Sequence, residues 1–244
     1  MLADLRLLPL DRLADMAEAG GQIRECYRLL RKGGGNIVGE VLRGHGAFCE
    51  WEHYPPGDVY DDETHSQYYY HAHPGACRFA EHGHFHTFLR PLGMPADVRP
   101  VGDDDASRAA GANDALCHLV AISMDGDGYP SRLFTTNRWV TGETWYAAAD
   151  VIRMLDRFMI DLAYPSLPVN IWITAMVRLF RPEIEALVRE RDAVLEARRA
   201  GEALGGETSG VYQDRDLEVV SSLPVSVEDQ VVRVAEALAL RLER

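Results

Sequence analysis

Positive charge is scarce in this chain of 244 residues. Twenty-five lysine and arginine residues stand against 38 aspartate and glutamate residues, so the formal net charge is −13. No basic stripe offsets the acidic excess locally, and a field of this sign repels phosphate backbones and anionic lipid headgroups. We therefore expect no nucleic acid and no membrane as partner. Assembly into a homo-oligomer is left open.

Paired cysteines and long apolar runs are also missing. The four cysteines are scattered and form no CxxC pair, which excludes a disulfide framework and favours a reducing compartment: Cys26, Cys49, Cys77 and Cys117. Acidic residues interrupt the first segment, where a signal peptide needs an apolar stretch. The most apolar run, 169–177, is too short to cross a bilayer. We expect a cytoplasmic protein.

The composition and patterning predict a single α+β domain over residues 1–244. With 47% apolar residues the chain can build a core without a metal or disulfide staple. Residues 1–35 read as a helical segment, 36–140 as a histidine-rich β region and 141–244 as a helical region. We expect a mostly antiparallel sheet over about 36–138, with the N-terminal helix and the C-terminal helices packed on it.

Individual elements follow from the local pattern. Short aromatic or β-branched segments bounded by Pro, Gly and Asp clusters predict strands at 36–42, 46–54, 66–73, 82–90, 117–124 and 131–138, and one more at 217–222. Apolar residues spaced three and four apart predict helices at 9–31 (with a break at Gly20-Gly21 left open), at 143–163, over part of 169–199 and at 227–243. Leu155 and Met159, central to the second stripe, should be buried.

Histidine is the residue type that the chain has in excess. Seven of its nine histidines lie within one stretch: His53, His65, His71, His73, His82, His84 and His86. Imidazole serves mainly as a metal ligand, an acid/base group or a pH switch. Nothing in β propensity favours so many histidines on two strands, so their clustering indicates a function. His45 and His118 lie outside the cluster, and His118 reads as a core histidine of a strand.

The spacing of these histidines predicts a shared face. Side chains alternate along a strand, so His71 and His73 share one face, and His82, His84 and His86 share one face. If a hairpin places His73 opposite His82, then His71 lies opposite His84 and Tyr69 opposite His86. All six side chains then point the same way, and opposite Cβ atoms lie about 4.5–5.5 Å apart. A register shifted by one residue would separate the two sets.

We interpret the hairpin as a transition-metal site. The candidate ligands are His71, His73, His84 and His86, three of them on one ion; a second ion is left open. Imidazoles with open coordination positions suit iron, copper or zinc. Candidate catalytic residues are Glu81, Tyr69 and His82, and Glu50, Glu52, Asp58, Asp61 and Asp62 are further carboxylates for the set or for holding a ligand imidazole.

The leading function is a metal-dependent enzyme acting on a small molecule. Neighbouring tyrosines and the lack of thiolate ligands favour redox or oxygen chemistry at iron or copper over zinc-activated hydrolysis with Glu81 or a histidine as general base. One alternative is a metal-carrying or metal-sensing protein without chemistry. Another is a metal-free enzyme that uses the histidines as acid and base.

Two resemblances accompany these residues. The segments YYYHAH and EHGHFHTF resemble those of an uncharacterised bacterial domain family over about residues 50–90, and that resemblance implies no function. An HxH pair followed by a glutamate and another histidine is loosely similar to the first cupin motif. Glu81 falls eight residues after His73, however, and no second glycine-and-proline histidine motif follows, so we do not assign the chain to the cupins.

Overall fold

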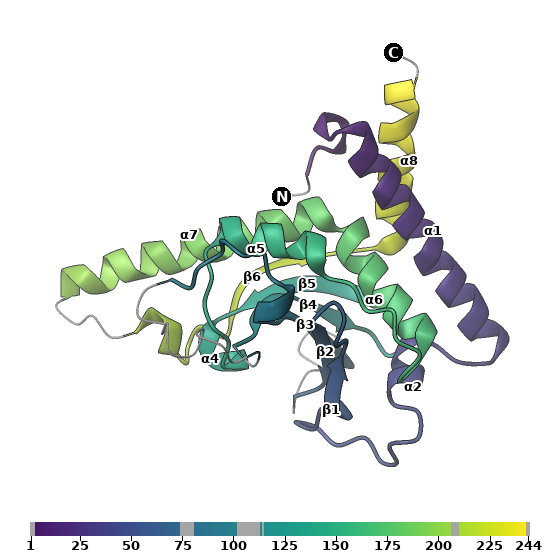
Figure 1. The fold of residues 1–244 in the computed structure, drawn as a ribbon, viewed down its shortest axis with the longest axis horizontal. Coiled ribbons are helices and arrows are strands. Elements are labelled where there is room, and N and C mark those ends of the chain that lie inside the picture. The colour runs from purple at the N-terminus through teal and green to yellow at the C-terminus, as the bar shows by residue number, and fades with distance from the viewer. Residues whose placement is uncertain (1–2, 74–80, 102–112, 114, 206–209, 243–244) are drawn as a thin grey trace.

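The fold is known from a computed structural model, which describes residues 3–73, 81–101, 113, 115–205 and 210–242 (Figure 1). Short 3-10 helices occur at Leu5–Leu7, Pro91–Gly93, Leu155–Arg157 and Val211–Gln213. The α-helices and strands follow in chain order: α1 (Leu10–Lys32), α2 (Ile37–Val41), β1 (Tyr54–Tyr60), β2 (Ser66–His71), β3 (Gly83–Leu89), β4 (Cys117–Met124), β5 (Pro130–Thr136), α4 (Arg138–Thr141), α5 (Ala148–Met154), α6 (Leu167–Leu179), α7 (Arg181–Gly205), β6 (Val219–Pro224) and α8 (Val227–Leu242).

The six strands form one antiparallel sheet in the order β1-β2-β3-β4-β5-β6, so every strand pairs with its neighbour in the chain. This confirms the predicted α+β class and the antiparallel sheet. The sixth strand comes from far beyond the predicted β region. It joins the sheet after the helices α4 to α7, with Phe134 of β5 opposite Ser222 of β6.

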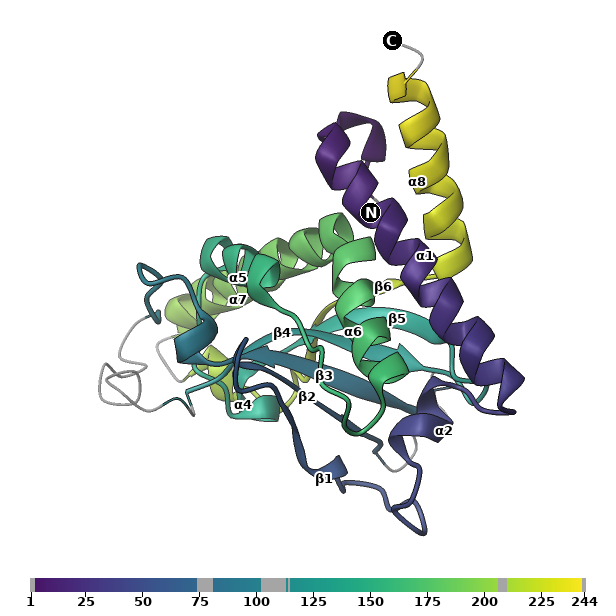
Figure 2. The ribbon, with the colours of Figure 1, turned by 45° about the vertical axis from the view of Figure 1, so that its right-hand side comes forward.

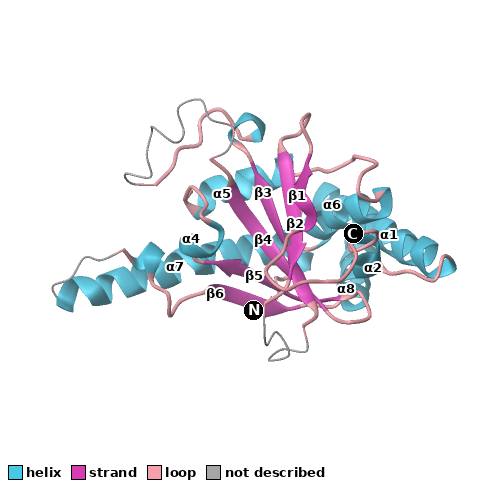
Figure 3. Ribbon diagram, turned by 90° about the horizontal axis from the view of Figure 1, so that it is seen from below, coloured by secondary structure: helices cyan, strands magenta, loops and turns pink. Residues whose placement is uncertain are grey.

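Helices cover one face of the sheet. The Tyr68 hydroxyl of β2 donates to Asn170 Oδ1 of α6 at 2.6 Å, and the Phe85 ring of β3 packs on Trp172 of the same helix. At the other end of the sheet, Ser221 of β6 donates to a backbone carbonyl of α7. In Figure 1 the helices α5, α6 and α7 lie above the strands, and the view from below in Figure 3 shows the strands in front of them. The face that carries Tyr68 and Phe85 is therefore the core face.

Helix α1 runs unbroken through Gly20-Gly21, so the break that the two glycines would permit does not occur. It lies beside α6 and α8 (Figure 2). A Cβ atom added at Gly20 would lie 2.7 Å from Val231 Cγ2 of α8. The glycine thus permits a close approach of two helices, and it costs α1 about 1 kcal/mol of helix propensity rather than ending it.

Two predicted strands before Tyr54 are wrong. Residues 37–41 form α2, because the Asn36 side chain accepts from the Gly39 amide at the helix start and the apolar residues of the segment turn into the core. Residues 46–53 form no strand, and β1 begins only at Tyr54. It includes Pro55-Pro56-Gly57, one of the Pro and Gly clusters that the sequence predicts to lie between strands. Prolines are tolerated there because β1 is an edge strand with a register shift between Tyr54 and Val59.

The predicted helix at 143–163 is much shorter in the structure. It comprises α5 and one 3-10 turn that ends at Arg157. Beyond that turn the Met159 amide donates to Ser66 Oγ and the Ile160 amide to Thr174 Oγ1, so side chains replace the helical carbonyls. Leu155 is buried as predicted, but Met159 is 44% exposed, and its predicted burial is wrong.

The later helices agree with the prediction of helix over part of 169–199 and at 227–243. Pro182 lies in the first turn of α7, directly after α6 ends, where a proline is tolerated because its missing amide needs no helical partner. Ser226 Oγ accepts from the Asp229 amide at 3.2 Å and caps α8, which spans nearly the whole range predicted for it. Among the described residues, no helix is both long and apolar enough to cross a membrane.

Candidate metal centre

The histidine hairpin has the predicted register. His71 lies opposite His84 and Tyr69 opposite His86 across β2 and β3, on the face turned away from α6. His73 and His82 lie just beyond the strand ends, and the connection 74–80 falls outside the described residues. The central pairs of the predicted constellation therefore share one face, while the expected His73–His82 pair lies outside the ladder.

Three imidazoles converge at the end of this hairpin. His71 Nε2 lies 2.8 Å from His84 Nε2 and 3.3 Å from His73 Nε2, and one ligand atom from each residue lies within 4.8 Å of the others. Nitrogens bound to one ion at 2.0–2.1 Å are about 2.9 Å apart at right angles and about 3.4 Å apart at the tetrahedral angle. The two separations, 2.8 Å and 3.3 Å, are close to these values. His71, His73 and His84 could thus hold one metal ion.

The protonation of these rings suits metal binding. Burial, together with the neighbouring His84 and His73, lowers the pKa of His71 to about 2. Burial and His84 also lower the pKa of His73. Both rings are therefore neutral at physiological pH, and only a neutral imidazole offers a lone pair to a metal.

Glu81 fixes the orientation of His84. Its Oε1 lies 2.5 Å from His84 Nδ1, and its Oε2 accepts from Arg132 at 3.1 Å. Burial alone would raise the pKa of Glu81, but its hydrogen bonds with His84 and Ser123 and the positive charge of Arg132 lower it overall. A carboxylate accepts a hydrogen bond from Nδ1–H, so the neutral ring has its lone pair on Nε2, the atom facing His71. The predicted catalytic residue Glu81 thus lies where an orienting residue belongs.

His86 lies on β3 two residues after His84, opposite Tyr69 and farther from the end of the hairpin at which the three imidazoles converge. Of the four predicted ligands it alone is missing from the group that could hold an ion among the described residues. Its Nδ1 lies 3.0 Å from Nε2 of His118, a residue that sequence reasoning left in the core of β4. His118 is 2% exposed, so it is a buried histidine as predicted, yet its ring belongs to the histidine face. A register shift between β3 and β4 beside Phe88 brings it there.

His82 turns to the core face, so its predicted place beside His84 is wrong. Its Nδ1 lies 2.7 Å from the Tyr70 hydroxyl, and its ring stacks on Phe48. His82 precedes β3, so strand alternation does not fix its direction. Gly83 leaves the space that this arrangement needs, because a Cβ atom there would lie 2.6 Å from the Tyr70 hydroxyl oxygen. This position separates His82 from the other predicted catalytic residues.

Tyr69, another predicted catalytic residue, lies on the histidine face and is sandwiched there. The His53 ring stacks on it with centroids 3.6 Å apart, and His71 and His86 flank it. His53 Nδ1 lies 2.9 Å from Asp58 Oδ1, so Asp58 orients His53 much as Glu81 orients His84. Sequence reasoning counted His53 in the cluster but gave it no role, since only the fold of 54–58 brings it back over β2.

An exposed tryptophan also belongs to the site. The Trp51 ring packs on His73 with centroids 4.4 Å apart, and the Trp51 amide donates to the Ala72 carbonyl. Nothing in the spacing of the sequence indicated this contact. Asp61, one of the predicted carboxylates, instead accepts from the amides of Glu63 and Thr64 and closes the turn before β2.

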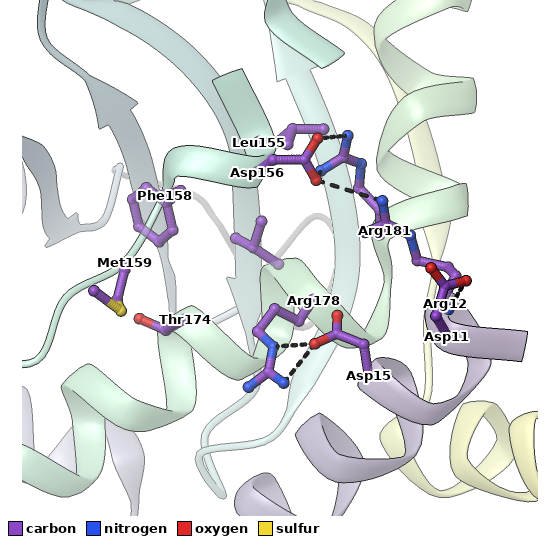
Figure 4. A pocket seen from close by; sticks show the side chains of 11 residues that line it. Asp11, Arg12, Asp15, Leu155, Asp156, Phe158, Met159, Thr174, Arg178 and Arg181 are labelled. Carbon is purple, nitrogen blue, oxygen red and sulfur yellow. Dashed lines mark hydrogen bonds and ion pairs between the residues drawn. The ribbon is translucent and has the colours of Figure 1, made fainter. Parts of the chain in front are cut away.

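A cavity of about 430 Å³ lies on the helical side of the molecule, away from the histidines. Its arginines face carboxylates: Arg178 pairs with Asp15, and Arg181 with Asp156 (Figure 4). Arg12 also reaches Asp156. These charges are compensated within the wall, so the cavity presents less specific chemistry than the histidine face.

Comparison with known proteins adds a family but no activity. A family model described as "Domain of unknown function (DUF6969)" matches residues 17–225, which include both halves of the histidine hairpin. Neither a curated protein nor a solved structure matches the chain.

Proposed function

The chain belongs to the DUF6969 family of unknown function, in keeping with the resemblance of its histidine segments, and we propose that it is a metal-dependent enzyme. The ion is held by Nε2 of His71, His73 and His84, and the substrate is a small molecule. The observation that carries this proposal is the convergence of three histidine nitrogens, two of whose separations equal those of ligands on one ion.

Three protein ligands favour catalysis over storage. A fourth position remains open even in tetrahedral coordination, as catalytic metal sites require, whereas structural sites close the coordination sphere with protein groups. His71 and His84 are buried, which removes the ion from bulk water. A carrier that exchanges its ion with solvent would place these ligands at the surface. This contrast favours the enzyme over the metal-carrying or metal-sensing alternative.

The three imidazole ligands limit which metal ions the site can bind. Three neutral imidazoles suit iron(II), copper or zinc and are a poor set for magnesium or calcium, which prefer oxygen ligands. Tyr69 stacks on His53 and meets the candidate ligand His71 edge to face. A tyrosine this close to the ion supports redox or oxygen chemistry at iron or copper. Zinc-activated hydrolysis is the alternative. For that reaction Glu81 is poorly placed as general base, because both of its oxygens are engaged by His84 and Arg132.

The test is elemental analysis of protein purified without a histidine tag. We expect about one transition-metal ion per chain. His71→Ala and His84→Ala should each abolish binding with little loss of secondary structure, because the apolar core lies on the other face of the sheet. His45→Ala, outside the site, is the matched control and should bind like the wild type.

Two outcomes would contradict the proposal. Protein that takes up no iron, copper or zinc after dialysis against each would favour the metal-free acid/base site. Binding that survives in His71→Ala and His84→Ala would place the ion elsewhere. The metal found would decide between redox chemistry and hydrolysis.

A further inference from the structure

Among the described residues, one buried nitrogen of the histidine face makes no hydrogen bond. His86 is 1% exposed, and its Nε2 makes no hydrogen bond within the part of the chain that the structure describes. A buried polar atom without a partner has lost its hydrogen bonds to water without replacement, so such atoms are rare unless a ligand or water completes them. The other ring nitrogen is already used, because Nδ1 lies 3.0 Å from His118 Nε2.

The His86 ring lies beside the rings of two candidate metal ligands. The His86 ring centroid lies 4.9 Å from that of His84 and 5.2 Å from that of His71. Tyr69 and Phe134 complete the surroundings, at 5.1 Å and 6.1 Å. His86 is nevertheless not among the residues that converge on the ion. Aromatic rings thus surround His86, and only a small group could reach its Nε2.

We propose that this position binds a small anion of two or three heavy atoms, coordinated to the ion at one end and hydrogen-bonded by His86 Nε2 at the other. The inference rests on the proposed function, because it requires the ion held by His71, His73 and His84. Three neutral imidazoles leave the positive charge of the ion uncompensated, and this charge attracts an anion. His86 supplies a directional contact that a ring-lined space otherwise lacks.

The hydrogen bond with His118 makes His86 a donor. In the proposed arrangement Thr136 Oγ1, which lies 3.5 Å from His118 Nδ1, donates to that nitrogen, and His118 carries its proton on Nε2. His118 then donates to His86 Nδ1, and the neutral His86 ring carries its proton on Nε2. His118 is thus a positioning residue that fixes the tautomer of His86, as an outer partner commonly does for an active-site imidazole.

The experiment uses cobalt(II)-loaded full-length protein with azide as the probe. Cobalt stoichiometry is measured first, by elemental analysis, and azide affinity second, by titration of the cobalt absorption bands. His86→Asn keeps a polar group near the Nδ1 position, whereas His86→Gln reaches the Nε2 position. We expect His86→Asn and His86→Leu to bind cobalt fully and azide about tenfold more weakly, the effect of one lost hydrogen bond. The azide affinity of His86→Gln should stay within about threefold of that of the wild type. The control His45→Asn should bind azide as tightly as the wild type.

The outcomes separate this inference from the proposed function. Wild-type protein that binds no cobalt defeats both. Full cobalt binding with equal azide affinity in the wild type and His86→Asn defeats the inference alone. Loss of cobalt in both His86→Asn and His86→Gln would make His86 a metal ligand and also overturn the inference. Because the Asn and Gln variants are both polar and neutral, their comparison stands even where His86→Leu fails to fold.

Discussion

Replacing Glu81 by glutamine tests whether the second layer of the site tunes its metal affinity. In the wild type the carboxylate accepts from His84 Nδ1 at 2.5 Å and is itself held by Arg132. Glutamine keeps the shape of the side chain but loses the charge that makes the imidazole a stronger ligand. It can also present its NH₂ group to His84, which would favour the wrong tautomer.

The expected magnitude follows from this geometry. Changes to a partner that orients a metal-bound histidine typically cost 10–100-fold in metal affinity. Since a tenfold change equals 1.36 kcal/mol, Glu81→Gln should weaken binding by about 1.4–2.7 kcal/mol. Glu81 is buried, so solvent screening should not reduce this loss much.

The assay is competition for zinc against a chromophoric chelator at pH 7.5. Glu236→Gln, at an exposed position on α8 outside the site, serves as the control and should leave the dissociation constant unchanged. Circular dichroism should report the same helix and strand content in both variants. If Glu81→Gln binds zinc as tightly as the wild type, Glu81 neither sets the orientation of His84 nor strengthens metal binding.

Two further predictions concern stability. Leu155→Ala should cost about 2–5 kcal/mol in urea denaturation, whereas Met159→Ala, at a 44% exposed position, should cost less than about 1 kcal/mol; equal losses would contradict the end of the helix at Arg157. The metal-free protein should also lose stability in acid, because His71 and His118 have folded-state pKa values lowered, chiefly by burial, to about 2 and about 3. Their unfolded pKa is about 6.5, so the unfolded chain takes up these protons first as the pH falls below 6.5, and at pH 5 each ring should cost about 2 kcal/mol. Urea denaturation at pH 7.5 and pH 5 would show this loss, and equal stability at the two pH values would mean that the rings are not buried in the neutral form.

The sheet and its histidine register were predictable because both depend on local alternation. Once His71 and His84 were placed on paired strands, a period of two fixed the side of each neighbour. The same rule could not place His82, which lies before the strand and turns to Tyr70. It could not find the contact between His86 and His118 either, since that pair lies 32 residues apart and depends on a register shift in the β3–β4 ladder.

The helical errors have a different cause. Apolar spacing predicted one helix through Met159, but backbone donors there bond to Ser66 and Thr174, partners that only the tertiary structure supplies. Residues 37–41 show the reverse case. Their β-branched residues favour a strand, yet the Asn36 cap and burial of the apolar side chains stabilise a short helix. Local propensity is a weak guide wherever a cap or a long-range hydrogen bond decides the outcome.

The order of strands in the sheet bears on when the site forms during folding. His71 and His84 are only 13 residues apart, on strands that pair directly, so little chain entropy opposes their meeting. The pairing of β5 with β6 must instead wait for the long excursion through α4 to α7. Loop closure of that length slows folding, which places β6 and α8 among the last elements to dock. Pulse-labelling hydrogen exchange should therefore find β2 and β3 protected before β6. The ligand hairpin would then be in place on a chain whose sheet is still incomplete, and an ion would meet it during folding as well as after it.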